Sequence, residues 1–181
     1  MHIPVIQIED LLAENADSEI MQGAASSGFL TLSGVDACLC IGQARQELIS
    51  FFDYGAEVRQ RTLRHKYDPS RPNLYRGFFP SEPEKNAMIE GFDIGADVAD
   101  PTIAGDGADP LTEPTPHPGI KGWDEAAKLY MQAMHQIAGA LTRSLLRSLD
   151  ADETLEQSMF GRSISTLRLL RYPQHSGEKF G

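Results

Sequence analysis

The sequence predicts a mixed α/β protein of the α+β kind, and two observations carry this prediction. One long segment, residues 123–149, repeats apolar side chains at spacings of three and four, as an amphipathic helix does. Three short runs, residues 5–8, 29–32 and 164–172, have the length and the apolar content of strands. Helices and strands do not alternate regularly along the chain, so we do not expect a doubly wound parallel sheet.

The first part of the chain is expected to hold two strands and two helices. Residues 5–8 and 29–32 are the strands. Asp17 is placed to cap a helix over residues 18–27. A second helix is predicted over residues 36–52, where apolar side chains recur as a rough stripe.

The middle of the chain, residues 68–122, has a different composition. It carries nine of the eleven prolines, and residues 82–113 include nine acidic side chains against one basic side chain. The prolines exclude a long helix here. Long irregular segments in compact domains are usually functional or disordered, so we predict an ordered start over residues 73–95 and a mobile acidic loop over residues 97–116.

Regular structure is predicted to return at residue 123. A helix over residues 123–149 would be ~40 Å long at ~1.5 Å per residue. Asp150 and Glu153 are spaced like a capping box for a short helix that follows. The strand over residues 164–172 has no later partner in the chain, and bare strand edges are usually covered. We therefore expect the chain to be the front part of a larger protein.

Charge and composition exclude several classes of partner. The net charge is −10 and the isoelectric point is about 4.9, which argues against general nucleic-acid binding and against docking on anionic membranes. We find no signal peptide at the N-terminus and no apolar run near the ~20 residues of a membrane span. Cys38 and Cys40 are too close for an ordinary disulfide, and we interpret them as small packed residues of a cytoplasmic protein.

No complete catalytic set is visible, so we assign no catalytic residue and no metal ligand. None of the five histidines is followed two positions later by an acidic residue or paired with another histidine at helical spacing. The two-His, one-carboxylate iron site therefore cannot be assembled from this sequence. Nucleophile-elbow, P-loop and dinucleotide-binding glycine motifs are also absent.

Six segments nevertheless stand in an order that resembles one known family. They are residues 3–6 (I-P-V-I), 27–35 (S-G-F-L-T-L-S-G-V), 74–80 (L-Y-R-G-F-F-P), 90–95 (E-G-F-D-I-G), the long helix, and 167–173 (L-R-L-L-R-Y-P). In residue pattern and order they are similar to the isopenicillin N synthase-like group of iron(II)/2-oxoglutarate-dependent oxygenases. The chain departs from that group at Ser33–Gly34, where the family has Asn-His-Gly, and it lacks an N-x-W-P before the long helix.

The resemblance implies a fold and a domain organisation. Residues 1–121 would be the non-haem dioxygenase N-terminal domain, with the long acidic loop over 97–116. Residues 122–181 would be the backbone helix and the first strands of a double-stranded β-helix (jelly roll), which this chain leaves incomplete. Fe(II) and 2-oxoglutarate are the implied cofactors, but the family's H-x-D, second His and Arg would come after residue 181. The chain alone is therefore expected to be inactive.

The resemblance also implies which residues meet small molecules. Tyr172 would hydrogen-bond a carboxylate of the substrate or cosubstrate, unless it only packs at the end of the strand. Tyr75, Arg76 and Phe79 lie in a segment that the family uses to touch the substrate. Arg76 would clamp a substrate carboxylate, or would be an ordinary surface arginine.

Two further residue groups carry structural expectations. Arg168 and Arg171 are three apart on the strand, so they should point to opposite faces, and at most one of them faces the cavity. We count Arg168 among the candidate binding residues. We expect Asp93 to cap a turn and Gly95 to allow a tight bend.

A different class of function remains open. In this alternative the chain is a truncated, non-catalytic binding module that pairs with itself or with another chain across the exposed strand 164–172. In the oxygenase interpretation the partner is a small organic substrate, and its identity and the reaction outcome stay open.

Overall fold

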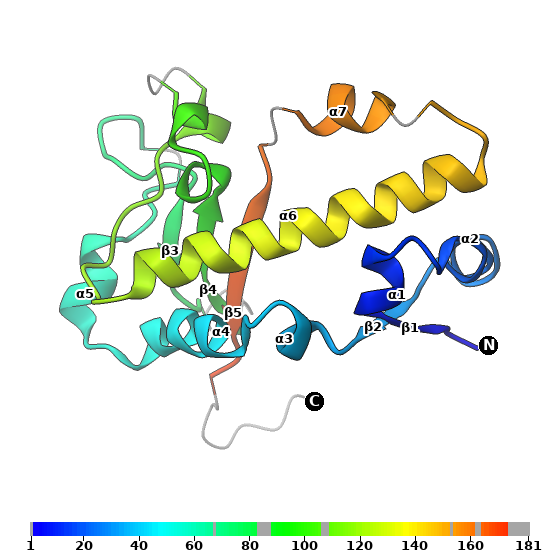
Figure 1. The fold of residues 1–181 in the computed structure, drawn as a ribbon. Helices are drawn as coiled ribbons and strands as arrows, with labels where there is room; N and C mark the ends of the chain where they lie inside the picture. The colour runs from blue at the N-terminus through cyan, green and yellow to red at the C-terminus, as the bar shows by residue number, and fades with distance from the viewer. Residues whose placement is uncertain are drawn as a thin grey trace, which may run out of the picture. The chain divides into compact units, whose positions relative to one another are not determined.

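The computed structural model describes residues 2–66, 68–82, 88–105, 109–152, 154–161 and 164–173. The contacts divide the chain into two compact units. Unit 1 comprises residues 1–46 and 128–163, and unit 2 comprises residues 47–127 and 164–181. Helices and two small sheets are mixed in the described residues (Figure 1), so the predicted fold class is confirmed at this level. Nowhere in these ranges is a helix both long and apolar enough to cross a bilayer.

Unit 1 begins with a small parallel sheet and short helices. Its elements are β1 (Val5–Gln7), α1 (Ile8–Leu12), α2 (Asp17–Ser26), β2 (Thr31–Ser33), α3 (Val35–Cys38) and the start of α4 (Gly42–Ile49). β1 pairs with β2 in parallel register, with Ile6 opposite Leu32. The first strand is shorter than predicted because Ile8, which is fully buried, begins α1 instead of ending β1.

The core of unit 1 is built by residues from α6 (Trp123–Ser148) packed with the N-terminal elements. Its buried members are all aliphatic: Ile6, Ile8, Leu11, Ala16, Ile20, Ile137 and Ala140. Met134, Leu141 and Leu145 pack against them from the same helix. The long helix and its apolar stripe are therefore confirmed, except that Leu149 lies past the helix end and is exposed.

The predicted helix over residues 36–52 is wrong as a single element. The chain forms α3, then α4, then a 3-10 turn η1 (Ser50–Asp53). The break falls at residues 39–41, where Cys40 has a left-handed φ of 53°, a conformation that cannot continue a helix. Cys38 and Cys40 are both free and exposed, so the expectation that they are packed is also wrong.

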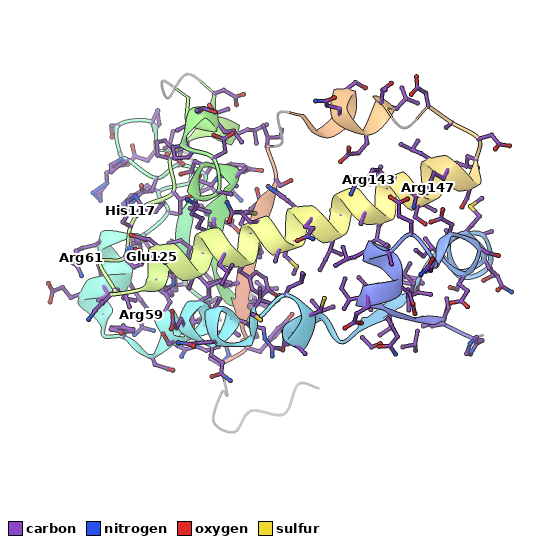
Figure 2. All side chains as sticks on the ribbon, in the orientation of Figure 1. Arg59, Arg61, His117, Glu125, Arg143 and Arg147 are labelled. Atoms are coloured by element: carbon purple, nitrogen blue, oxygen red, sulfur yellow. The ribbon has the colours of Figure 1, made fainter. Side chains whose placement is uncertain are left out.

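The predicted N-cap at Asp17 is replaced by an ion pair. Ala16 occupies the cap position of α2 without a side-chain cap bond. Asp17 instead accepts hydrogen bonds from Arg147 Nε at 2.7 Å and Nη2 at 2.8 Å, from the last turns of α6 (Figure 2). This pair ties α2 to the end of α6 within unit 1.

The short helix after α6 is confirmed as α7 (Thr154–Phe160). The carboxylate of Asp152 accepts the Thr154 amide at 2.9 Å. Glu153, which we predicted as part of the cap, lies outside the described residues.

Unit 2 is organised around an antiparallel sheet. Its strands are β3 (Gly77–Phe79), β4 (Glu90–Gly95) and β5 (Thr166–Arg171), with β4 in the middle. β5 confirms the predicted terminal strand in a shorter form. A helix α5 (Ala56–Arg61), which no pattern in the sequence predicted, precedes the sheet. In the described residues of the acidic part of the chain, 3-10 turns form at η3 (Ala96–Val98), η4 (Pro101–Ile103) and η5 (Pro110–Thr112).

One face of this sheet packs on aromatic rings. Phe92 of β4 has its ring centre 4.7 Å from that of Phe51 and 5.2 Å from that of Trp123. Phe78 lies opposite Phe92 on the neighbouring strand and contacts Phe51 as well. The Trp123 indole donates to the Leu48 carbonyl at 3.4 Å. The start of α6 is thereby fixed to the core of unit 2.

Gly77 should be essential for the geometry of β3. Its φ is +99°, and a Cβ there would overlap the carbonyl oxygen of Thr62, which accepts the Phe78 amide. We expect Gly77→Ala to lower the free energy of unfolding by about 3 kcal/mol or more, from backbone strain plus overlap. Urea denaturation followed by circular dichroism measures this change.

Gly119→Ala is the matched control for that experiment. Gly119 also has a left-handed φ of +70°, but a Cβ there would meet only ordinary contacts with Arg61. Gly119→Ala should lower the free energy of unfolding only by the backbone strain, about 1 kcal/mol. Equal losses in the two variants would contradict the proposed overlap at Gly77.

The Asp17–Arg147 pair should give unit 1 a stability that depends on pH. The Arg147 hydrogen bond, opposed by partial burial, holds the pKa of Asp17 below its usual value. A lowered carboxyl pKa stabilises the fold above the unfolded pKa of about 3.9, and the effect disappears as the pH falls through the folded pKa. We expect Asp17→Asn to lower the free energy of unfolding by about 1 kcal/mol at pH 7, and by less as the pH falls below the unfolded pKa.

Asp36→Asn serves as the control, because Asp36 pairs with Arg45 in unit 1 but both side chains are about half exposed. Its unfolding free energy should change by less than about 0.5 kcal/mol at either pH. Urea midpoints at pH 7 and pH 3 would count against the argument if Asp17→Asn stayed equally destabilised at both.

Candidate functional site

The second face of the unit 2 sheet is polar and partly open. Side chains alternate along strands, so the strand register sorts them by face. Phe79, Asp93, Arg168 and Leu170 lie on one side, while Phe78, Phe92 and Leu169 lie on the other, in the aromatic core. We call the first side, together with Arg64 that reaches it, the Asp93 face. It is the candidate functional surface of unit 2.

Asp93 is the centre of this face. Its side chain is 1% exposed, and it accepts hydrogen bonds from two arginines. Arg168 of β5 donates through Nε at 2.6 Å and Nη2 at 3.0 Å, and Arg64 donates through Nη1 at 2.8 Å. The expectation that Asp93 caps a turn is wrong, because Asp93 lies inside β4 as a buried counter-ion.

Arg64 reaches Asp93 because its segment runs beside β3. Phe78 donates its amide to Thr62 and accepts the amide of Arg64, each at 2.7 Å. No sequence pattern indicated this pairing, so Arg64 was missed. Asp93 and Arg168 did carry a signal, since a charged residue within an apolar strand needs a buried partner.

The Phe79 ring lies close to both guanidinium groups. Arg64 is 4.6 Å and Arg168 is 5.4 Å from the centre of its ring, within the range of cation–π attraction. The ring lies over Gly91 of β4, where a Cβ would come within 2.5 Å of the ring edge. Gly91 therefore provides the space that the Phe79 ring occupies.

The expectation that Arg168 and Arg171 point to opposite faces is confirmed. Arg171 pairs with Glu90 and lies 5.2 Å from the centre of the Phe52 ring, on the core side. Arg168 is on the Asp93 face and its side chain is 53% exposed. The hydrogen bonds that Arg168 donates to Asp93 raise the pKa of Arg168, so this residue stays a cation at any ordinary pH.

Arg76 is not an exposed surface residue, as one of our two interpretations had it. It is 1% exposed, and its guanidinium donates to Thr166 Oγ1 and to the Leu111 carbonyl. Burial lowers the pKa of Arg76, while Asp97 and Asp93 act in the opposite direction. Tyr75 is partly exposed, and its ring lies 5.5 Å from the Arg76 guanidinium.

Tyr172 follows the last residue of β5 and is 67% exposed. Its hydroxyl is thus available to a ligand. Leu170, two residues earlier, is also exposed. The structure brings Phe79 and Arg168 together, while Tyr75 contacts Arg76 at the start of β3.

The described residues do not provide an iron site. Among them, no three His, Cys, Asp or Glu side chains gather closely enough to hold a metal ion. Asp93 and Glu90 are engaged by arginines, and such carboxylates are poor ligands for a metal. The donor set described here therefore does not fit iron.

Comparison with solved structures identifies a shared fold. A full-length protein of Neurospora crassa, solved in complex with α-KG, superposes with a TM-score of 0.69 at 18% identity, covering 94% of this chain and 51% of that protein. JOX2 in complex with 2OG, Fe and JA gives 0.64 at 20% identity, with 97% and 49% covered. Arabidopsis thaliana AtDAO1, a dioxygenase for auxin oxidation solved with 2-oxoglutarate, gives 0.58 at 21%, with 84% and 52% covered.

The comparisons establish the fold and no closer relationship. No family model matches the sequence, and no curated protein matches it significantly. The chain spans about half the length of each of these three solved structures. It therefore shares its fold with about half of each of these three chains.

Removing the charge of Asp93 should destabilise unit 2. Asp93→Asn leaves Arg64 and Arg168 without their common counter-ion. Removing one partner of a buried ion pair costs about 3–5 kcal/mol. Because Arg168 is half exposed, we expect the free energy of unfolding to fall by an amount near the lower end of that range. Equilibrium urea unfolding measures it.

Asp53→Asn is the matched control, since Asp53 is largely exposed and lies 3.6 Å from Arg171. It should change the unfolding free energy by less than about 0.5 kcal/mol. A similar small change for Asp93→Asn would show that the Asp93 cluster does not hold the sheet.

Proposed function

We propose that the chain is the N-terminal part of an iron(II)/2-oxoglutarate-dependent oxidoreductase of the isopenicillin N synthase-like group. The observation that carries the proposal is the fold shared, over 94% of this chain, with the Neurospora crassa protein solved in complex with α-KG. JOX2, which was solved with 2OG and Fe, supports it over 97% of the chain. In this proposal β5 is the first strand of a double-stranded β-helix.

The proposed role of this chain is to form a wall of the substrate cavity. The Asp93 face supports this role because it combines a buried, rigid ion pair with partly open aromatic and cationic groups. Asp93 engages Nε and Nη2 of Arg168, so Arg168 Nη1 can donate to an acceptor on a ligand. Tyr172 would add a hydroxyl donor, and Phe79 and Tyr75 would pack on the ligand's apolar part.

Arg76 has a different proposed part. Its guanidinium already binds Thr166 and Leu111, so in this proposal it positions Tyr75 rather than clamping the substrate carboxylate directly.

The oxidising chemistry would come from iron and 2-oxoglutarate held by residues outside this chain. The described residues offer no ligand set for iron. We therefore propose that these 181 residues alone are inactive. The protein's contribution here is orientation of the substrate and exclusion of water.

The proposal includes the partner class and the compartment. The net charge of −10 disfavours nucleic acids and anionic membranes as partners, so a small organic substrate is proposed. Cys38 and Cys40 are free thiols at the surface, which persist in a reducing compartment. We propose the cytoplasm.

Turnover of 2-oxoglutarate tests this function. The 181-residue chain should release no succinate above the background of iron and 2-oxoglutarate without protein. The natural gene product, isolated by a tag placed before Met1, should contain iron and release succinate. Succinate formation by the 181-residue chain would overturn its proposed inactivity, and absence of both iron and turnover from the natural product would overturn the oxygenase proposal.

The alternative is a non-catalytic module that dimerises through β5. Among the described residues β5 pairs only with β4, so its outer edge offers unpaired backbone groups. Ile164 and Leu170 are about half exposed beside that edge. Strand addition by a second copy is a known way to cover such an edge.

Light scattering after size exclusion distinguishes the two. The dimer alternative predicts about twice the chain mass of 19.9 kDa, and a monomer after Ile164→Lys combined with Leu170→Lys, which places like charges across the interface. A monomeric wild-type chain would remove the alternative.

A further inference from the structure

Glu113 is held in an unusual way by the loop before β3. Its carboxylate accepts hydrogen bonds from three consecutive backbone amides: Leu74 to Oε1 at 2.7 Å, Tyr75 to Oε2 at 2.8 Å, and Arg76 to Oε2 at 3.0 Å. Successive amides that converge on one anion form a nest, the arrangement by which many proteins bind phosphate and carboxylate groups. We call residues 74–76 the amide nest.

The backbone conformation explains why these amides converge. Asn73 has a φ of +60° and Gly77 a φ of +99°, so left-handed residues stand on both sides of the amide nest. They bend the chain sharply at each end. The three amides then point to a common place instead of joining the strand ladder, which begins at Gly77.

A buried cation accompanies the amides. The Arg76 guanidinium has two neutral acceptors, Thr166 Oγ1 and the Leu111 carbonyl, and its Nε has no partner among the described residues. Three carboxylates, those of Asp97, Asp93 and Glu113, are near enough to favour its charged form. Asp97 accepts hydrogen bonds from Thr115, and Asp93 accepts them from two arginines. Of the three carboxylates near Arg76, Glu113 is therefore the one that the amide nest binds.

We propose that the amide nest is a carboxylate-binding site, in which Glu113 is a tethered occupant that a free carboxylate can replace. The ligand class is a small carboxylate such as acetate or formate, or the carboxylate end of a larger acid. Tyr75 supplies one of the amides and its side chain is partly exposed. The body of a larger acid would therefore lie beside the Tyr75 ring.

The tether of Glu113 has a second anchor that does not depend on the amide nest. Thr115 donates to Asp97 through its amide at 2.8 Å and its hydroxyl at 2.7 Å, and it accepts the Gly95 amide at 2.8 Å. Replacement of Glu113 by a free acid would thus release the Glu113 side chain, while Leu111 keeps its hydrogen bond from Arg76 and Thr115 stays fixed to the end of β4. This site does not rest on the proposed oxygenase function.

Rescue by a free carboxylate tests the site. Glu113→Gln keeps the length of the side chain and removes its charge, which empties the amide nest of its anion. We expect sodium acetate, exchanged for sodium chloride at constant ionic strength, to raise the melting temperature of this variant saturably, by roughly 3 °C at ten times the dissociation constant. In ¹H–¹⁵N spectra the amides of residues 74–76 should shift as acetate is added.

Two comparisons make the result decisive. Wild type should respond only at much higher acetate concentrations, because the tethered Glu113 carboxylate competes with acetate for the amide nest. Glu125→Gln on the first turn of α6 removes the same charge at an exposed position (Figure 2) and should behave like wild type. Equal responses of all three proteins, or no response of Glu113→Gln, would overturn the proposal, as would amide shifts elsewhere. If Glu113→Gln does not fold in chloride, recovery of folded protein in acetate supports the site and failure to recover overturns it.

Discussion

The buried carboxylate of Asp93 is the constraint on which the sheet of unit 2 depends. It receives three hydrogen bonds from Arg64 and Arg168, and these arginines come from segments that are far apart in the sequence. A buried charge is tolerated only when its partners are in place. The pairing of residues 62–64 beside β3 and the antiparallel register of β4 with β5 both bring an arginine to Asp93. Loss of either pairing would leave this charge uncompensated.

Strand β4 separates two environments. On one face Phe92 packs with Phe51, Phe78 and Trp123 and supplies the hydrophobic stability of the unit. On the other face Asp93 organises cations around Phe79 and leaves Arg168 partly open. A site needs a rigid base as well as accessible groups, and β4 provides both because its side chains alternate between the two faces.

The acidic segment has a structural role that its composition did not indicate. Part of its charge is used internally, since Glu113 binds the amides of residues 74–76 and Asp97 binds Thr115. Carboxylates serve well here because each can accept several hydrogen bonds from a strongly bent backbone. The segment is therefore connected to the start of β3 and the end of β4, and its mobility between those points stays a prediction.

The sequence by itself determined the elements whose signal is local: the 3.6-residue period of α6, the helix α2, and the apolar runs that became β2 and β5. It also placed Arg168 and Arg171 on opposite faces, because that follows from strand alternation alone. It could not predict the break at Cys40, since no glycine or proline marks that left-handed residue. Only the tertiary structure decided the partners of Asp17, Asp93 and Glu113, which are Arg147, Arg64 with Arg168, and three backbone amides. These contacts join residues 29 to 130 positions apart, and the physical reason is that a carboxylate's choice of partner depends on which groups the fold brings near it.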